Sequence, residues 1–389
     1  TNNLFPTLEK SVLHLGDNLE TIRKYPDNSV DVIITDAPYG LNTKIHDVQQ
    51  LAKKYLKGKS YFLGGKGVDG EEWDSDLPSL ELCKELLRVL KPGGYIICFS
   101  AARTYDIAAF TLRWVGFQIK DQLIWAYASG VPKTEWLDKK MKDDPQAHLF
   151  IGKNESLKPA HEPIILAQKP PEFENITENI KKWGTGALNI ESVRFMGPDG
   201  KPRYPANIIT DGSITIRQAY NGGDQYFNSC PLGFHGEFLN RNLYYSKSSD
   251  KEKDFGLDLY TPEKYRTAMM SGNETKIKNP HPTVKPIALM RHLVKLVSDP
   301  GQIVLDCFMG SGTTGVAATL EGRRFIGMEI GEEYHKVAKL RIERTYRLIE
   351  KYRTTDHQII MASQELEITK VMLTNAGTFL EMFPDHHRI

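Results

Sequence analysis

The chain has 389 residues, of which 40% are hydrophobic and 25% charged, and its formal net charge is +1. These values are ordinary for a folded globular protein, and no apolar run reaches the length of a membrane-spanning helix. The four cysteines form no Cys-x-x-Cys pair and the first residues show no signal pattern, which favours a reducing cytoplasm over secretion, disulfide bonds or a zinc site.

Short apolar runs alternate with helical patterns through the first half of the chain. We predict strands at 13–15, 30–35, 95–99, 118–127 and 161–167, helices at 19–25, 78–91 and 103–115, and a polar, mobile loop over 41–75. This alternation predicts an α/β fold with a mostly parallel, twisted sheet and helices on both of its faces.

A polar segment, Thr-Asp-Ala-Pro-Tyr-Gly, directly follows the strand predicted at 30–35. Such a segment can hold a flat ring that carries an amino group, because Asp36 and the Ala37 carbonyl can accept its two N–H bonds while Tyr39 stacks on the ring. Pro38 fixes its own φ and favours an extended Ala37, which aims the carbonyl. An ordinary turn explains this segment equally well when it is taken alone.

The composition changes over residues 170–270, which are rich in Gly, Asn, Tyr, Ser and Pro. Few helical periods occur there, so we expect an irregular or β-containing insertion. Sheet periodicity returns after residue 280. A long charged helix is predicted over 332–352, and the apolar residues of 353–389 keep helical spacing.

A second polar segment follows a short apolar strand at 303–305. Asp306 ends this strand, a Gly-Ser-Gly turn follows at 310–312, and a helix starts at Thr313. Glycines let the backbone approach a ligand closely, so this is the pattern of a nucleotide-cofactor loop. The next strand ends at Glu329, about 20 residues later, where a carboxylate can hold the two hydroxyls of a ribose.

Asp306 restricts the kind of cofactor that this loop can accept. A carboxylate placed before the glycines would repel a pyrophosphate, and the turn lacks the Gly-x-Gly-x-x-Gly pattern. A cofactor with a cationic amino-acid end and no phosphate fits better, and S-adenosylmethionine meets that description. Because loops at the carboxyl ends of parallel strands converge, we expect the strands before Asp36 and Asp306 to be close neighbours.

Three segments resemble motifs of the β-class DNA amino-methyltransferases and occur in that family's order. Residues 36–39 resemble the Asp-Pro-Pro-Tyr motif, residues 279–286 resemble the stretch before the cofactor loop, and residues 306–314 resemble the loop itself. The resemblance implies a Rossmann-like fold. It also implies methyl transfer from S-adenosylmethionine to the N6 amino group of adenine in double-stranded DNA, with the base flipped out of the duplex.

The resemblance also divides the chain. It implies a catalytic half over 1–169, a target-recognition region over 170–278, a cofactor-binding half over 279–352 and a helical extension over 353–389. Such enzymes are often dimers, for which the long charged helix and the tail offer an interface. A cognate restriction endonuclease is a further partner that the resemblance admits, and the source would be bacterial, archaeal or a phage.

The resemblance assigns roles to individual residues at the two ends of one site. The catalytic residues are Asp36, Ala37, Pro38 and Tyr39, and the cofactor-binding residues are Asp17, His281, Thr283, Lys285, Asp306, Phe308, Gly310, Ser311, Gly312, Thr313 and Glu329. Within the second set, His281, Thr283 and Lys285 would flank the methionine end of the cofactor. A turn-forming role explains Asp17 equally well, and a helix N-cap explains Thr283 nearly as well.

Candidates for DNA contact come from three regions: a loop at 129–134 that resembles a family loop beside the target pocket, the polar loop at 41–75, and the basic residues of the middle region. The residues are Trp73, Ser129, Lys133, Arg203, Arg241 and Lys247. Trp73 would be a wedge or a lid, although simple packing also explains it. A solvated face explains any single basic residue.

One departure from the family motif and three competing functions stay open. Ala37 replaces the first proline of the family motif, and activity is expected to survive because a carbonyl acts at that position. An initial Asp favours adenine N6 and an initial Ser favours cytosine N4, so an N4-cytosine enzyme is the alternative. A nucleotide-dependent oxidoreductase is a further alternative, and Asp306 argues against it. A catalytically silent DNA-binding protein is another, and the intact Asp36 and Tyr39 argue against it.

Overall fold

A computed structural model of the chain describes residues 11–40, 48–59, 77–127, 134–196, 201–210, 228–229, 248, 250–262, 266–270 and 273–353. Within these residues the core is a nine-stranded sheet in the order β1-β13-β12-β2-β3-β5-β4-β8-β9. Its strands are β1 (Ser11–Leu15), β2 (Val30–Thr35), β3 (Leu90–Phe99), β4 (Gln118–Ala126), β5 (His161–Gln168), β8 (Ile208–Thr210), β9 (Asn228–Ser229), β12 (Ile303–Asp306) and β13 (Arg324–Glu329). Only the pairs that involve β5 are antiparallel among them, so the prediction of a mostly parallel sheet is confirmed.

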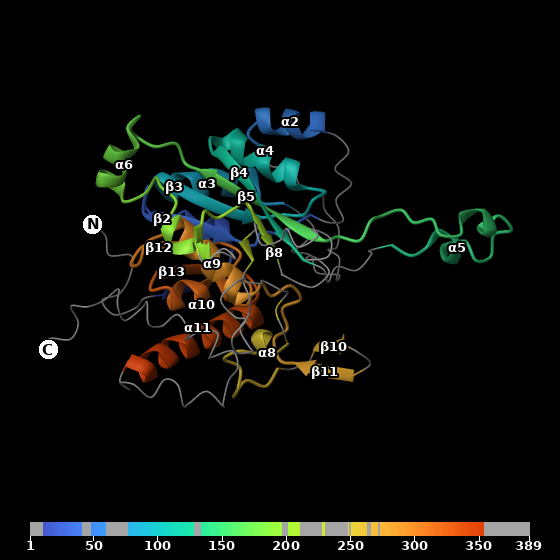
Figure 1. The fold of residues 1–389 in the computed structure, drawn as a ribbon. Coiled ribbons are helices and arrows are strands. Elements are labelled where there is room, and N and C mark those ends of the chain that lie inside the picture. The colour runs from blue at the N-terminus through green and yellow to red at the C-terminus, as the bar shows by residue number, and fades with distance from the viewer. Residues whose placement is uncertain are drawn as a thin grey trace.

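Helices cover both faces of this sheet (Figure 1). One face carries α1 (Asn18–Ile22), α3 (Leu80–Val89) and α4 (Tyr105–Val115), and the other carries α9 (Ile287–Val297), α10 (Thr313–Leu320) and α11 (Glu332–Arg353). Strand β2 shows why both faces need a cover: Val32 and Ile34 pack into the core under α9 to α11, while Ile33 packs into the core under α1, α3 and α4. The predicted two-sided arrangement is therefore confirmed.

Strands β2 and β12 are direct neighbours in the sheet. They pair in parallel, with Val304 opposite Val32 and Leu305 opposite Ile33. The polar residues that follow both strands therefore emerge at the same edge, and the hydroxyl of Thr35 donates a hydrogen bond to Asp306 Oδ1 at 2.8 Å. This neighbourhood is the arrangement that the sequence predicted.

The prediction of a loop over 41–75 is wrong for one part of it. Helix α2 (Val48–Leu56) forms there, because Leu51 and Tyr55, one helical turn apart, bury themselves against Leu80 and Ile107. Two apolar residues in a lysine-rich stretch are a weak sequence signal, which explains the error. The rest of that loop lies outside the described residues.

The middle region contains β-structure, as expected, and also helices that were not predicted. Strands β8 and β9 extend the main sheet, and two small hairpins pair β6 (Phe195–Met196) with β7 (Pro202–Arg203) and β10 (Arg266–Met270) with β11 (Asn273–Ile277). The unpredicted helix α6 (Ile176–Trp183) begins at the Asn175 side-chain cap and ends at Gly184, whose φ is +72°. Short elements here are η3 (Glu191–Val193) and α8 (Asp250–Lys253).

Residues 134–160 form an arm between β4 and β5 that projects from the body and carries α5 (Leu137–Lys140) and η2 (Ala147–Phe150) (Figure 1). Its two sides are joined by a hydrogen bond from Leu137 N to Lys153 O at 3.0 Å. Among the described helices, none is both long enough and apolar enough to cross a membrane. The predicted helical extension falls outside the described residues from position 354 onward.

Candidate active site

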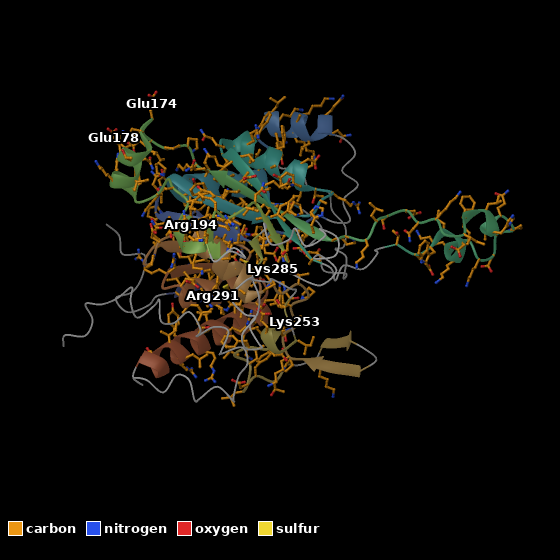
Figure 2. All side chains as sticks on the ribbon, in the orientation of Figure 1. Glu174, Glu178, Arg194, Lys253, Lys285 and Arg291 are labelled. Atoms are coloured by element: carbon orange, nitrogen blue, oxygen red, sulfur yellow. The ribbon has the colours of Figure 1, made fainter. Side chains whose placement is uncertain are left out.

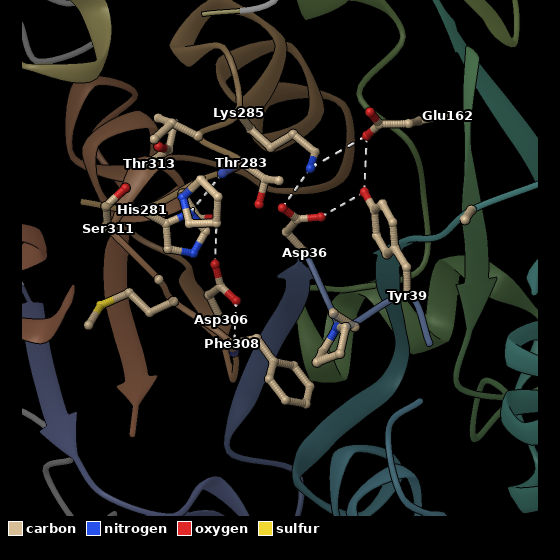
Figure 3. A pocket seen from close by; sticks show the side chains of 18 of the residues that line it. Asp36, Tyr39, Glu162, His281, Thr283, Lys285, Asp306, Phe308, Ser311 and Thr313 are labelled. Atoms are coloured by element: carbon tan, nitrogen blue, oxygen red, sulfur yellow. Dashed lines mark hydrogen bonds and ion pairs between the residues drawn. The ribbon is translucent and has the colours of Figure 1, made fainter. Parts of the chain in front are cut away.

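A cavity of about 1120 Å³ opens at the edge where β2 and β12 end (Figure 3). Its lining includes these predicted site residues: Asp17, Asp36, Ala37, Pro38, Tyr39, His281, Thr283, Lys285, Asp306, Phe308, Gly310, Ser311, Thr313 and Glu329. The two distant segments of the chain therefore share one cavity. Gly312 does not line it and instead occupies the N-cap position of α10.

The Asp36 end of the cavity contains a charged cluster of four side chains, which we call the Asp36 cluster: Asp36, Tyr39, Glu162 and Lys285. Lys285 Nζ lies 2.6 Å from Asp36 Oδ2 and 3.4 Å from Glu162 Oε2. The Tyr39 hydroxyl lies 2.9 Å from Asp36 Oδ1 and 3.0 Å from Glu162 Oε2. Figure 3 shows these side chains converging from different elements.

Glu162 was missed by the sequence analysis, and the reason is the direction of β5. In the parallel strands the polar residues at this edge follow the strand, as Asp36 follows β2. Because β5 runs antiparallel to β3, it presents its first residues at the same edge, and Glu162 is the second residue of β5. An acid at the start of an apolar strand was the available signal.

Burial and the neighbouring charges set the protonation of this cluster. Burial raises the pKa of Asp36 and Glu162 acts in the same direction, whereas Lys285 lowers it. Burial alone would lower the pKa of Lys285, but Asp36 and Glu162 outweigh it and the pKa is raised, so Lys285 stays an ammonium ion. Burial, Asp36 and Glu162 together raise the pKa of Tyr39 well above its usual value, so Tyr39 stays a neutral phenol.

The other end of the cavity is built around Asp306 and Glu329. Asp306 is buried and accepts hydrogen bonds from the Thr35 and Thr314 hydroxyls and from Phe308 N, at 2.8, 2.6 and 3.1 Å. Burial raises the pKa of Asp306 to about 6. Glu329 accepts from the backbone N–H groups of residues 310 and 331, both at 2.8 Å. Both carboxylates therefore hold the loop in shape as well as lining the cavity.

The glycine turn is held closely from behind by α11. Gly310 and Gly312 have φ values of +52° and +80°, a region that favours glycine. A side chain at position 312 would meet Ala338 of α11 at 2.8 Å. The fully buried Arg341 of the same helix donates a hydrogen bond to the Ser311 carbonyl at 2.7 Å. This contact, which stabilises the turn, was not identified from the sequence.

The remaining predicted residues take identifiable positions. Asp17 caps α1 by accepting from Glu20 N at 2.8 Å, as the turn-forming alternative requires, and it also lines the cavity. Thr283 is not the N-cap of α9, which is Pro286, and its N–H lies 3.3 Å from His281 Nδ1. Lys285 lines the cavity and contacts Asp36.

The candidates for DNA contact are largely untested. Trp73, Ser129, Lys133, Arg241 and Lys247 lie outside the described residues. Arg203 is half-buried in the small β6–β7 hairpin. Figure 2 shows Arg194 and Lys253, two more basic residues of the middle region, at separate places on the ribbon.

Comparisons with known proteins find relatives over most of the chain. A family described as DNA methylase (N6_N4_Mtase) matches residues 30–340. The chain is 26% identical to the DNA adenine methyltransferase YhdJ of Escherichia coli, over 86% of this chain and 83% of YhdJ. It is 24% identical to the Type II methyltransferase M.HindIII of Haemophilus influenzae, over 85% of this chain and 94% of that protein.

Solved structures of other methyltransferases are also similar to this chain. M1.HpyAVI in complex with SAM is 20% identical, with a TM-score of 0.41, over 85% of this chain and 99% of that one. The PvuII DNA methyltransferase, described as cytosine-N4-specific, is 16% identical, with a TM-score of 0.45, over 93% of this chain and 92% of that one.

Proposed function

The chain belongs to the DNA methylase family of N6 and N4 enzymes, and from this premise we propose that it methylates the N6 amino group of adenine in double-stranded DNA, with S-adenosylmethionine as the methyl donor. The observation that carries the proposal is the single cavity lined by both Asp36 and the glycine turn. The initial Asp of the tetrad favours adenine. The name of YhdJ, an adenine methyltransferase, points the same way.

The target amine is assigned to the Asp36 end. The lone pair of a base amino nitrogen is delocalised into the ring, so the nitrogen is a poor nucleophile. Hydrogen bonds from its two N–H groups to Asp36 and to the buried Ala37 carbonyl would localise that pair, and a hydrogen bond to a charged group contributes about 1.5–3 kcal/mol. When nitrogen gains the methyl group, one N–H bond breaks and Asp36 takes the proton as an O–H.

The residues at the other end fit S-adenosylmethionine. Gly310 lines the cavity without presenting a side chain to a ligand, and Gly312 lets the turn pack against α11. The carboxylates of Asp306 and Glu329, which also line the cavity, suit the cationic amino group and the ribose hydroxyls of this cofactor. Each carboxylate oxygen has two lone pairs, so both can accept a ligand donor beside their present hydrogen bonds. When bound, the cofactor supplies the electrophilic methyl group, and positioning of the two reactants should supply most of the rate.

Base flipping follows from the depth of this site, because an amino group inside a duplex cannot reach Asp36. We propose that the exposed side chain of Leu157 fills the space that the flipped base leaves in the duplex. Leu157 is 92% exposed and lines the cavity from the root of the arm, next to Lys158. Aliphatic wedges between base steps are a common device of proteins that distort DNA. Trp73, our earlier candidate, lies outside the described residues.

Four further proposals concern organisation and assembly. The resemblance suggests domain boundaries at residues 170 and 279, a homodimer through the helix at 332–352 and the tail that follows it, and a cognate restriction endonuclease. The cysteine pattern suggests a cytoplasmic location. Sedimentation of the full chain at working concentration tests the dimer, and a monomer would end that part of the proposal.

The test of the function identifies both the base and the donor. The chain is incubated with duplex DNA and S-adenosylmethionine carrying a labelled methyl group, and the nucleosides of the digested DNA are separated and identified by mass. Labelled N6-methyladenine is the expected product. Labelled N4-methylcytosine alone would establish the alternative base. No labelled nucleoside, together with binding of NAD in preference to S-adenosylmethionine, would overturn the methyltransferase assignment.

A further inference from the structure

One carboxylate of the middle region holds the start of the family stretch at 279–286. Asp254 Oδ1 accepts hydrogen bonds from the backbone N–H groups of Lys278 and Asn279, both at 2.9 Å, and its Oδ2 lies 3.0 Å from Lys278 N. The fully buried Asn279 in turn donates from its side-chain amide to the Lys253 carbonyl at 2.9 Å. Residues 253 and 254 therefore fix the backbone at the point where the stretch begins.

The stretch reaches the glycine turn through His281. The side-chain oxygen of Asn279 accepts from His281 N at 3.0 Å, which fixes the backbone from which the histidine side chain leaves. The ring lies so close to Gly310 that a Cβ atom there would come within 2.7 Å of His281 Nε2. It also meets Tyr334 of α11 edge to face, with ring centroids 4.8 Å apart. Displacing the stretch would therefore displace a side chain on which the turn packs.

A second route to the turn passes through α11. Gly256 follows Asp254 by two residues and has a φ of +80°, and a side chain there would meet the Arg341 Cα atom of α11 at 3.0 Å. The fully buried Arg341 donates from Nη1 to the Ser311 carbonyl at 2.7 Å and to the Thr313 hydroxyl at 3.1 Å. One arginine therefore links the same part of the middle region to the turn.

Apolar contacts join these residues of the middle region to the half of the fold that carries the glycine turn. Phe255 is buried in the core that α9, α10 and α11 share. Leu257 and Tyr260 pack against Val337 and Leu340 of α11. The preceding helix, α8, lies near one end of α11 in Figure 1. The packing therefore does not separate these residues from the cofactor-binding half, although the resemblance places them in the target-recognition region.

We propose that residues 253–257, which we call the support segment, position the cofactor turn at 310–312, with Asp254 and Arg341 as the positioning residues of the two routes. Neither side chain lines the cavity, so both act through residues that do. The cofactor-binding unit then begins before residue 253 instead of at residue 279. That the turn binds S-adenosylmethionine rests on the proposed function, whereas the support of the turn depends only on the fold.

The first experiment follows amide hydrogen exchange of the wild type, Asp254→Ala and Asp254→Asn without DNA or cofactor. Asp254→Ala removes the acceptor of two backbone N–H groups, so peptides covering 278–285 and 307–314 should exchange about fivefold faster or more. Asparagine keeps one oxygen that can accept from both N–H groups, and Asp254→Asn should recover most of the protection. Unchanged exchange over 307–314 in Asp254→Ala would overturn the proposal.

Asn179→Ala is the matched control for a general loss of stability. It removes a buried amide that donates to the carbonyls of Pro92 and Thr185 at 2.9 and 2.8 Å, outside the cavity. This variant should lower Tm without faster exchange over 307–314. Faster exchange there in both Asn179→Ala and Asp254→Ala would show general loosening, and the assignment of a specific support would be wrong.

Arg341→Lys tests the second route and does not depend on the folding of Asp254→Ala. Lysine keeps the positive charge but loses the planar fork of donors that reaches the Ser311 carbonyl and the Thr313 hydroxyl. Exchange over 307–314 should rise, while exchange over 278–285 should stay as in the wild type. Exchange over 307–314 that equals that of the wild type would remove Arg341 from the proposal.

The target end of the family stretch is held separately, which lets cofactor binding be measured apart from the chemistry. On one side of Lys285, the Ser248 hydroxyl donates to the Val284 carbonyl at 2.7 Å. On its other side, Ile287 N donates to Glu252 Oε1 at 2.6 Å. Loss of the Asp254 side chain leaves both of these contacts, so Lys285 should keep its place beside the target amine.

The second experiment therefore compares the Kd of S-adenosylmethionine with kcat at saturating cofactor. Asp254→Ala should raise Kd by about tenfold and lower kcat by less than about threefold, and Asp254→Asn should restore Kd. If Asp254→Ala instead weakens DNA binding and leaves the cofactor Kd unchanged, the support segment belongs to target recognition and the proposal is wrong. A wild type that binds no S-adenosylmethionine would refute the proposed function, and the exchange experiment would still decide whether the segment supports the turn.

Discussion

Lys285 and Asp36 are 249 positions apart in the sequence, yet Lys285 Nζ lies 2.6 Å from Asp36 Oδ2. The contact joins the stretch before the cofactor loop to the catalytic tetrad. Lys285 is 7% exposed and its pKa is raised, so its charge is permanent at working pH. The stretch at 279–286 therefore reaches the Asp36 tetrad, and under the proposed function Lys285 would act on Asp36 as well as at the cofactor end to which the resemblance assigned it.

Replacing Asp36 by Ala should abolish methyl transfer while cofactor binding persists. The change removes both the acceptor of the amine N–H and the acceptor of its proton, and general acid–base groups commonly contribute about 10²–10⁴-fold. Turnover is measured with duplex DNA, and cofactor binding by titration calorimetry. Unchanged turnover would refute the role of Asp36, and lost cofactor binding would show that the variant disturbs the whole cavity.

Replacing Lys285 by Met should shift the acidic limb of the kcat/KM profile to higher pH. Lys285 lowers the pKa of Asp36, so its loss raises that pKa further and the ionised acceptor disappears at a higher pH. The measurement is kcat/KM from pH 5 to pH 9 for the wild type and the variant. Lys84→Met, at an exposed lysine on α3, is the control and should leave the limb where it is. A limb that moves to lower pH would contradict the assigned contact.

The two strand-end motifs could be predicted because they follow a general rule of parallel sheets. Asp36 and Asp306 each follow an apolar run, and the rule that carboxyl ends converge was enough to place them together. Glu162 escaped that rule because β5 runs the other way, and no local pattern in the sequence reveals strand direction. The role of Arg341 could not be predicted because its charge suggests a solvated face of α11. In the structure it instead contacts the glycine turn, which packs against that helix.

Replacing Tyr39 should separate stacking from hydrogen bonding. Tyr39→Ala removes the ring, and loss of stacking costs about 1–3 kcal/mol per base, so turnover should fall more than cofactor affinity. Tyr39→Phe keeps the ring but breaks the link between Glu162 and Asp36, and its turnover should lie between those of the wild type and Tyr39→Ala. Both are compared in kcat and in cofactor Kd. Cofactor affinity that falls more than turnover would count against stacking.

Cofactor affinity should fall as the pH drops through about 6. Burial raises the pKa of Asp306 to about 6, and its protonated form no longer attracts a cationic amino group. Thr314 donates to Asp306 Oδ2 and lowers that pKa, so Thr314→Val should move the midpoint of the affinity loss to higher pH. Titration calorimetry with S-adenosylmethionine from pH 5 to pH 8 checks both statements. An affinity that is flat across this range would remove Asp306 from the cofactor site.

Loss of the Leu157 side chain should lower methylation of matched duplexes strongly. It should lower methylation much less when the target base is already unpaired. Unstacking a base costs a few kcal/mol, least when the base is unpaired, so a wedge is needed most in intact DNA. Leu157→Ala should therefore lower kcat/KM on a matched duplex by about tenfold and recover most of that loss when an abasic site stands opposite the target. Leu149→Ala, at an exposed leucine further out on the arm and away from the cavity, is the control and should affect neither substrate. Equal losses for Leu157→Ala on both duplexes would mean that Leu157 contacts the flipped base or the backbone instead of filling the gap.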